Sequence, residues 1–312
     1  MGSRAPRSQA VTSERSPEAE ARVELAAALY QDVRVLASEI GERNTATCRN
    51  LDRAATFIHH SLASAGLPVF HHTYTADGLA CDNVVGELEG IGDDHEIVLI
   101  GAHYDSVRGG PGANDNASGV AALLALARSF ARNRLNRTMR FVAFVNEEPP
   151  YIRTRQMGSL VYAMACSSRG DHIVAMLSLE TLACFPSYDP PSNYPWPAKL
   201  LRPLQGEFLA LVSNLRSRRL ARGIARTFCG ASDLSVWAIA LPGFLPGVRS
   251  SDHWSFWQCG YPAIMATDTG PFRYPFYHTR YDTPDKLSYR ALAEIVTGLR
   301  PAIMQLASGK AP

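Results

Sequence analysis

Four short hydrophobic runs, each closed by polar residues, constrain the fold of this chain most. They lie within "HEIVLIGAH", "MRFVAFVNEE", "HIVAMLSLE" and "YPAIMATDT". Continuous β-branched and aliphatic residues of this kind are typical of strands buried on both faces of a sheet. Helical spacing of apolar residues appears between them, from Val120 to Phe130 and in "MGSLVYAMAC". The alternation predicts an α/β fold with a mixed, mostly parallel central sheet flanked by helices.

The two ends of the chain differ in composition. Residues 1–17 are rich in Ser, Arg, Pro and Glu, which predicts a disordered tail. Ser16 and Pro17 then form a helix-start signal. Residues 18–312 are expected to form one domain, with an irregular excursion at about 182–250. That excursion contains the proline-rich "FPSYDPPSNYPWPAK" and a basic surface helix within "LVSNLRSRRLARGIARTF".

Charge and hydropathy exclude several functions. The 31 basic and 29 acidic residues give a net charge of +2, too balanced for a nucleic-acid-binding surface. No run approaches the ~18 apolar residues that a membrane span needs. The N-terminus lacks the apolar core of a secretory signal, so a cytoplasmic protein is expected by default, and a secreted one if a signal has been removed. The six cysteines form no CxxC pair and are expected to be buried small hydrophobes.

Polar residues with metal-binding side chains follow the predicted buried strands. In open α/β sheets, ligands gather beyond the carboxyl ends of the strands. Hydrophobic strands that each end in a histidine or a carboxylate offer imidazole and oxygen ligands, which suit zinc or a related divalent ion. The candidate residues are His103, Asp105, Asp115, Glu147, Glu148, Glu180 and His278.

Charge counting favours two ions. Asp115, Glu148 and Glu180 with two neutral histidines bring −3, so two divalent cations leave +1, which one bridging hydroxide neutralises. Two zinc ions about 3.5–4 Å apart lower the pKa of a shared water and polarise a carbonyl. A proton acceptor is still needed. Glu147 is the candidate general base, because consecutive residues leaving a strand point in different directions.

Six motifs now indicate a family. "GAHYDSV", "GANDNASG", "VNEEPPY", "LSLET", "SSDHWSFW" and "YHTRYDTPDKL", in this order, resemble the M28 family of zinc metallopeptidases. The resemblance runs from about the first helix to near the C-terminus. It implies a phosphorylase/hydrolase-like α/β fold and a zinc-dependent exopeptidase, expected to be an aminopeptidase acting on peptides with a free N-terminus.

The resemblance also implies which residues bind zinc. His103 and Glu180 would hold one zinc ion, Glu148 and His278 the other, and Asp115 would bridge them. Many relatives carry Asp at the position of Glu180, and the longer side chain still binds zinc.

Other residues receive roles from the same resemblance. Glu147 would be the base, and Asp105 would orient the first histidine from behind it. Tyr277 matches members in which a tyrosine hydroxyl stabilises the oxyanion. Asp252 and His253 are expected to shape the wall of the site.

Three alternatives remain open. A glutaminyl-cyclase-like acyltransferase has a related fold but one zinc ion. A carboxypeptidase acting on acidic dipeptides would need substrate-binding arginines that the sequence does not locate. An inactive binding module is disfavoured by the intact ligand set. The other histidines are expected to be surface or packing residues: His59, His60, His71, His72, His95 and His172.

Overall fold

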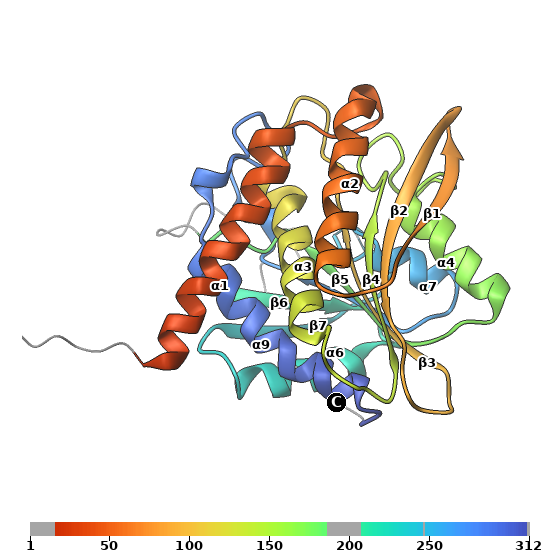
Figure 1. The fold of residues 1–312 in the computed structure, drawn as a ribbon, viewed down its shortest axis with the longest axis vertical. Helices are drawn as coiled ribbons and strands as arrows, with labels where there is room; N and C mark the ends of the chain where they lie inside the picture. Colours follow the sequence, from red (N-terminus) through yellow and green to blue (C-terminus); the bar gives the residue numbers. More distant parts are fainter. Residues whose placement is uncertain (1–15, 186–206, 246, 311–312) are drawn as a thin grey trace, which may run out of the picture.

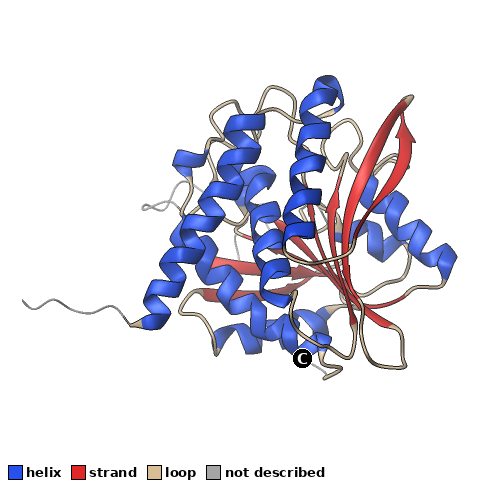
Figure 2. Ribbon diagram, in the orientation of Figure 1, coloured by secondary structure: helices blue, strands red, loops and turns tan. Residues whose placement is uncertain are grey.

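A central sheet of eight strands organises the protein (Figures 1 and 2). The structure, a computed structural model, describes residues 16–185, 207–245 and 247–310. The spatial order of the strands is β1-β2-β4-β3-β5-β8-β6-β7. Their bounds are β1 (Val69–Ala76), β2 (Leu79–Leu88), β3 (Glu96–His103), β4 (Thr138–Phe144), β5 (His172–Glu180), β6 (Phe208–Ser213), β7 (Ser235–Ala240) and β8 (Ala263–Thr267).

Helices cover both faces of the sheet. Figure 1 shows α1, α2, α3, α6 and α9 on one side and α4 and α7 on the other. The α-helices are α1 (Pro17–Arg34), α2 (Cys48–Ser64), α3 (Gly119–Phe130), α4 (Gly158–Arg169), α6 (Arg218–Cys229), α7 (His253–Gln258), α8 (Gly270–Arg273) and α9 (Tyr289–Ala307). Shorter turns are the π-helical η1 (Val35–Ile40) and η3 (Ala113–Ser118) and the 3-10 helices η2 (Thr45–Thr47) and η4 (Pro284–Lys286).

The middle of the sheet is parallel, as the sequence predicts. Strands β4, β3, β5 and β8 run in the same direction, so their carboxyl ends lie along one edge. Strand β2 joins β4 antiparallel on one side, and β6 joins β8 antiparallel on the other. The predicted mixed, mostly parallel α/β sheet is therefore confirmed.

Strand β3 explains why these runs lack polar alternation. Val98 and Ile100 are fully buried in the core under α3. The intervening Ile97 and Leu99 pack into a second core with residues of α4 and α7. Because both faces of the pleat are covered, neither face tolerates a polar residue.

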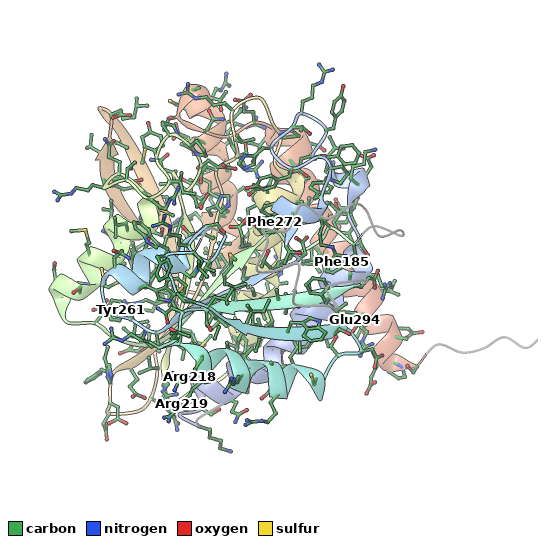
Figure 3. The ribbon with its side chains drawn as sticks, turned by 180° about the vertical axis from the view of Figure 1, so that it is seen from behind. Phe185, Arg218, Arg219, Tyr261, Phe272 and Glu294 are labelled. Carbon is green, nitrogen blue, oxygen red and sulfur yellow. The ribbon has the colours of Figure 1, made fainter. Side chains whose placement is uncertain are left out.

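Figure 3 shows the molecule from behind. On that side, the hydroxyl of Tyr261 donates a hydrogen bond to the carbonyl of Asp171 at 3.0 Å.

The region from 182 to 250 is more regular than expected. Strands β6 and β7 both lie within it and extend the sheet beyond β8. They pair parallel with each other, and α6 connects them along the chain. The letters "LVS" end β6, and the basic helix begins only at Arg218. The pattern misleads because "FLALVS" runs directly into a segment of helical periodicity. The proline-rich run from Pro186 onward lies outside the described residues.

The predicted helix start is present, since Ser16 caps α1 and Pro17 is its first residue. Residues 1–15 of the expected tail lie outside the described part of the chain. All six cysteines are free, but Cys48 and Cys229 are exposed, so the prediction of burial is wrong for these two. No helix within the described ranges is long and apolar enough to cross a membrane.

Gly101 in β3 has no room for a side chain, because a Cβ would lie 2.4 Å from Cε2 of Phe144 in β4. We expect Gly101→Ala to lower the free energy of unfolding by about 1–3 kcal/mol, since overpacking forces the ring to move. Urea denaturation measures this. Gly230→Ala is the control, because its Cβ would meet only the Thr227 carbonyl, at 3.5 Å. Equal stability of the two variants would contradict the packing argument.

Candidate metal centre

The candidate side chains converge at the carboxyl ends of the parallel strands. His103 is the last residue of β3 and Glu180 the last of β5, while Glu147 and Glu148 follow β4. All four are buried. Neighbouring parallel strands end at the same edge, so the sheet itself gathers these groups.

Two groups of ligand atoms share one carboxylate. In the first, Nε2 of His103 lies 3.2 Å from Oδ1 of Asp115 and 3.3 Å from Oε2 of Glu180. In the second, Nε2 of His278 lies 3.1 Å from Oδ2 of Asp115 and 3.2 Å from Oε2 of Glu148. The atoms of each group lie within 4.8 Å of one another. Each oxygen of Asp115 therefore faces a different histidine.

These spacings suit metal ions. Zinc lies about 2.0–2.2 Å from nitrogen and oxygen ligands, which places neighbouring ligand atoms roughly 3–3.5 Å apart. Each group contains buried atoms without a hydrogen-bond partner among the described residues: His103 Nε2, His278 Nε2, Asp115 Oδ1 and Glu148 Oε1. Burial, with the neighbouring Asp115, raises the pKa of Glu148 to about 7. Divalent cations would satisfy these atoms and compensate the buried negative charge.

The segment that carries Asp115 is fastened by Asp282. The carboxylate of Asp282 accepts hydrogen bonds from the backbone N–H of Asn114 at 2.8 Å and of Asp115 at 3.1 Å. The hydroxyl of Tyr274 donates to it at 2.9 Å. Asp282 thus sets the position of the shared carboxylate without belonging to either ligand group.

Asn116 ties the same segment to the end of β5. Its amide donates to the carbonyl of Leu179 at 2.8 Å and accepts from the N–H of Thr181 and of Gly119 at 3.1 Å each. A Cβ at Gly119 would lie 2.5 Å from the Leu179 oxygen, so only glycine fits there. The "GANDNASG" motif therefore brings Asp115 beside Glu180.

Asp105 supports both sides of the centre. Its carboxylate accepts from the backbone N–H groups of Glu147 and Glu148, each at 3.1 Å. Nδ1 of His103 lies 3.2 Å from the Asp105 carbonyl and 3.5 Å from its carboxylate. The contact of Asp105 with His103 was expected from the resemblance, whereas its hold on the two glutamates was not. A further contact not predicted is that of Ser251, which donates to Oε2 of Glu180 at 2.7 Å.

Glu147 lies beside the centre but outside both ligand groups. Its Oε2 is 3.9 Å from Nε2 of His103, and its Oε1 has no hydrogen-bond partner among the described residues. Burial, together with the charges of Glu180 and Glu148, raises its pKa well above the usual range. A buried carboxyl group beside the ligand atoms can serve as a proton acceptor and donor in catalysis.

Tyr277 stacks on the ring of His278, with centroids 3.9 Å apart and planes inclined by 15°. Burial, and then the carboxylates of Asp115 and Glu148, raise the pKa of its hydroxyl far above 10. The phenol therefore remains protonated and can act as a hydrogen-bond donor.

Asp252 and His253 lie outside both ligand groups. Asp252 is fully buried, and burial raises its pKa to about 7. His253 contacts the carbonyl of Val248 through Nε2 at 2.7 Å and packs edge-on against Trp257.

A buried arginine lies near the acidic groups, and no motif in the sequence predicted it. Arg43 is fully buried and donates to the carbonyls of Tyr104 at 2.6 Å and Gly112 at 2.7 Å. Burial lowers its pKa to about 10, while the carboxylates of Asp105 and Asp282 counteract that shift. The guanidinium thus stays charged at neutral pH.

Comparisons with known proteins show which family this chain resembles. The pattern of peptidase family M28 matches residues 83–189 and 221–302, together more than half of the chain. The protein YfbL of Escherichia coli K12, described as uncharacterized, is 36% identical over 280 residues, covering 87% of this chain and 85% of that one. A probable leucine aminopeptidase 2 of Arthroderma benhamiae is 36% identical over 94 residues, which cover 30% of this chain and 18% of that protein.

The fold also matches a solved structure. A zinc aminopeptidase from Bacillus subtilis has a TM-score of 0.71 and 16% identity, covering 90% of this chain and 95% of that one. The chain belongs to peptidase family M28. It is therefore a metallopeptidase, and zinc is the metal that the family and the donor set imply.

Removing the charge of Asp282 tests how Asp115 is positioned. We expect Asp282→Asn to weaken zinc binding by about 10–100-fold, the usual effect of losing a group that orients a ligand. Competition with a chromophoric chelator measures this. The matched control is Asp285→Asn, because Asp285 is exposed and its carboxylate accepts hydrogen bonds from Thr283 and Lys286, away from the ligand groups. Wild-type affinity in Asp282→Asn would show that Asp115 is held by other contacts.

Proposed function

We propose that the protein is an aminopeptidase that binds two zinc ions and hydrolyses the N-terminal peptide bond of peptides. The observation that carries this proposal is the shared carboxylate, because the two oxygens of Asp115 face His103 and His278 separately. A centre for one ion needs no such division. The first ion would be held by His103, Asp115 and Glu180, and the second by Asp115, Glu148 and His278.

The residues around the centre would divide the chemistry. Bound zinc lowers the pKa of a water molecule and polarises the scissile carbonyl. Glu147 takes a proton from the attacking water on its carboxylate and returns it to the leaving amine. Tyr277 donates its hydroxyl proton in a hydrogen bond to the oxygen on which negative charge develops. Asp105 keeps Glu147 and Glu148 in place through their backbone N–H groups.

The same centre supports preference for a free N-terminus. Glu147 and Glu148 offer carboxylate oxygens beside the two histidines, and an ammonium group is complementary to them in charge. An acetylated peptide lacks that charge and should be a poor substrate. A panel of aminoacyl anilides with and without N-acetylation measures this preference.

The role of Glu147 is tested by Glu147→Gln. We expect kcat to fall by about 10²–10⁴-fold, because the amide cannot accept the proton. Zinc content should stay unchanged, since Glu147 belongs to neither ligand group. Glu148→Gln is the contrasting variant and should lose zinc as well as activity. Full activity of Glu147→Gln would exclude it as the base.

Metal content, measured on the same preparations, separates the alternatives. Two zinc ions per chain with anilide hydrolysis supports the proposal. One ion with cyclisation of N-terminal Gln would point instead to the acyltransferase. Absence of both activities in the zinc-loaded protein would favour a binding module.

Tyr277→Phe tests the oxyanion donor. We expect kcat to fall by about 10²–10³-fold with little change in KM, because the hydrogen bond strengthens only in the transition state. The phenyl ring keeps the stacking on His278. Steady-state kinetics at saturating zinc measure both constants, and an unchanged kcat would remove Tyr277 from the mechanism.

A further inference from the structure

Two histidines outside the metal centre, one in a helix and one in a strand, lie in contact with each other. Nδ1 of His59 in α2 lies 3.0 Å from Nε2 of His71 in β1. On the other side of the His71 ring, Nδ1 lies 2.9 Å from Oδ2 of Asp82 in β2. Thr73, directly opposite Asp82 in the β1–β2 ladder, donates its hydroxyl to Oδ1 of Asp82 at 2.5 Å. Figure 1 shows α2 next to this hairpin.

Asp82 fixes the proton on the His71 ring. Its carboxylate is an acceptor, so Nδ1 of His71 carries the hydrogen and Nε2 keeps its lone pair, aimed at His59. A carboxylate behind one nitrogen of an imidazole whose other nitrogen binds metal is the usual arrangement of a metal-ligating histidine.

The spacing of the two nitrogens also suits a metal. Two ligands about 2.0–2.1 Å from one ion lie roughly 2.9–3.4 Å apart, depending on the bond angle. The 3.0 Å between His59 and His71 falls in this range, close to the 3.1–3.3 Å within the two ligand groups of the metal centre. A hydrogen bond between two neutral rings has the same length, and a metal ion would replace its proton.

We propose that His59 and His71 form a second, accessible site for a divalent transition metal such as zinc, separate from the metal centre. Nδ1 of His59 and Nε2 of His71 would be the protein ligands, and water would complete the coordination. Asp82 acts as the positioning residue for His71.

Charge and exposure support such a site. Partial burial, and then the nearby His71 and His60, lower the pKa of His59, which favours the neutral imidazole that binds metals. The side chains of His71 and Asp82 are each 33% exposed, so an ion can reach them from solvent. A bound ion would cross-link α2 to the β1–β2 hairpin.

The test compares zinc content among variants that keep the metal centre intact. Each protein is equilibrated with excess Zn²⁺ by dialysis, and metal per chain is counted. We expect wild type to hold one zinc more than His59→Ala or His71→Ala. The control His60→Ala removes an exposed histidine from the same helix and should match wild type. Because the result is a difference, it does not depend on how many ions the metal centre holds.

Asp82→Asn adds a readout that a purely structural role would not change. We expect it to bind the additional zinc with about 10–100-fold lower affinity, because the ring of His71 loses its orienting charge. Should an alanine variant be destabilised, the matching His→Gln variant replaces it. Equal zinc content in wild type, His59→Ala and His71→Ala would overturn the proposal and leave a hydrogen bond between two histidines.

Discussion

Burial of several carboxylates at one edge of the sheet is the constraint on which the rest of the structure depends. Strands β4, β3 and β5 run parallel and deliver Glu147, Glu148 and Glu180 to the same place, where Asp115 joins them. Negative charge at this depth is costly unless it is compensated. In this protein the imidazoles of two histidines and backbone N–H groups lie against the carboxylates. The arrangement of these side chains also suits divalent cations, which would balance the remaining negative charge. The carboxylates of Asp105 and Asp282 accept hydrogen bonds from backbone N–H groups. These bonds hold in place the segments whose carboxylates face the histidines.

Much of this arrangement could be predicted from the sequence because each buried strand carries its own signal. A mainly apolar run that ends in His103 or Glu180 predicts both the strand and the residue at its end. The order in which β4, β3 and β5 lie side by side was not predicted, because parallel pairing allows several orders and only the folded chain shows this one. The contact of His278 with Asp115 was expected only from the family resemblance, since the loop that carries His278 has no periodic pattern.

Other features left no readable trace in the sequence. Strand β6 was missed because its apolar residues run straight into the amphipathic pattern of α6, and β7 is short and half-exposed. Arg43 was missed because an arginine between two helices is usually solvated, and only the folded chain shows that carbonyls surround it. The pairing of His59 with His71 was not expected either, because it depends on how α2 packs against β1.

Arg43 connects the acidic residues of the metal centre to the stability of the fold. Its charge is sealed in the interior, and the opposite charges near it include Asp105, Asp115 and Glu148. A descendant that replaced these three acids would leave the buried cation with fewer carboxylates to balance it, Asp282 being one that remains. Such a lineage would keep a buried cation with poorer charge balance, which lowers the free energy of unfolding. Replacing these acids is therefore expected to lower stability as well as activity, whereas replacing Glu147 lowers activity alone.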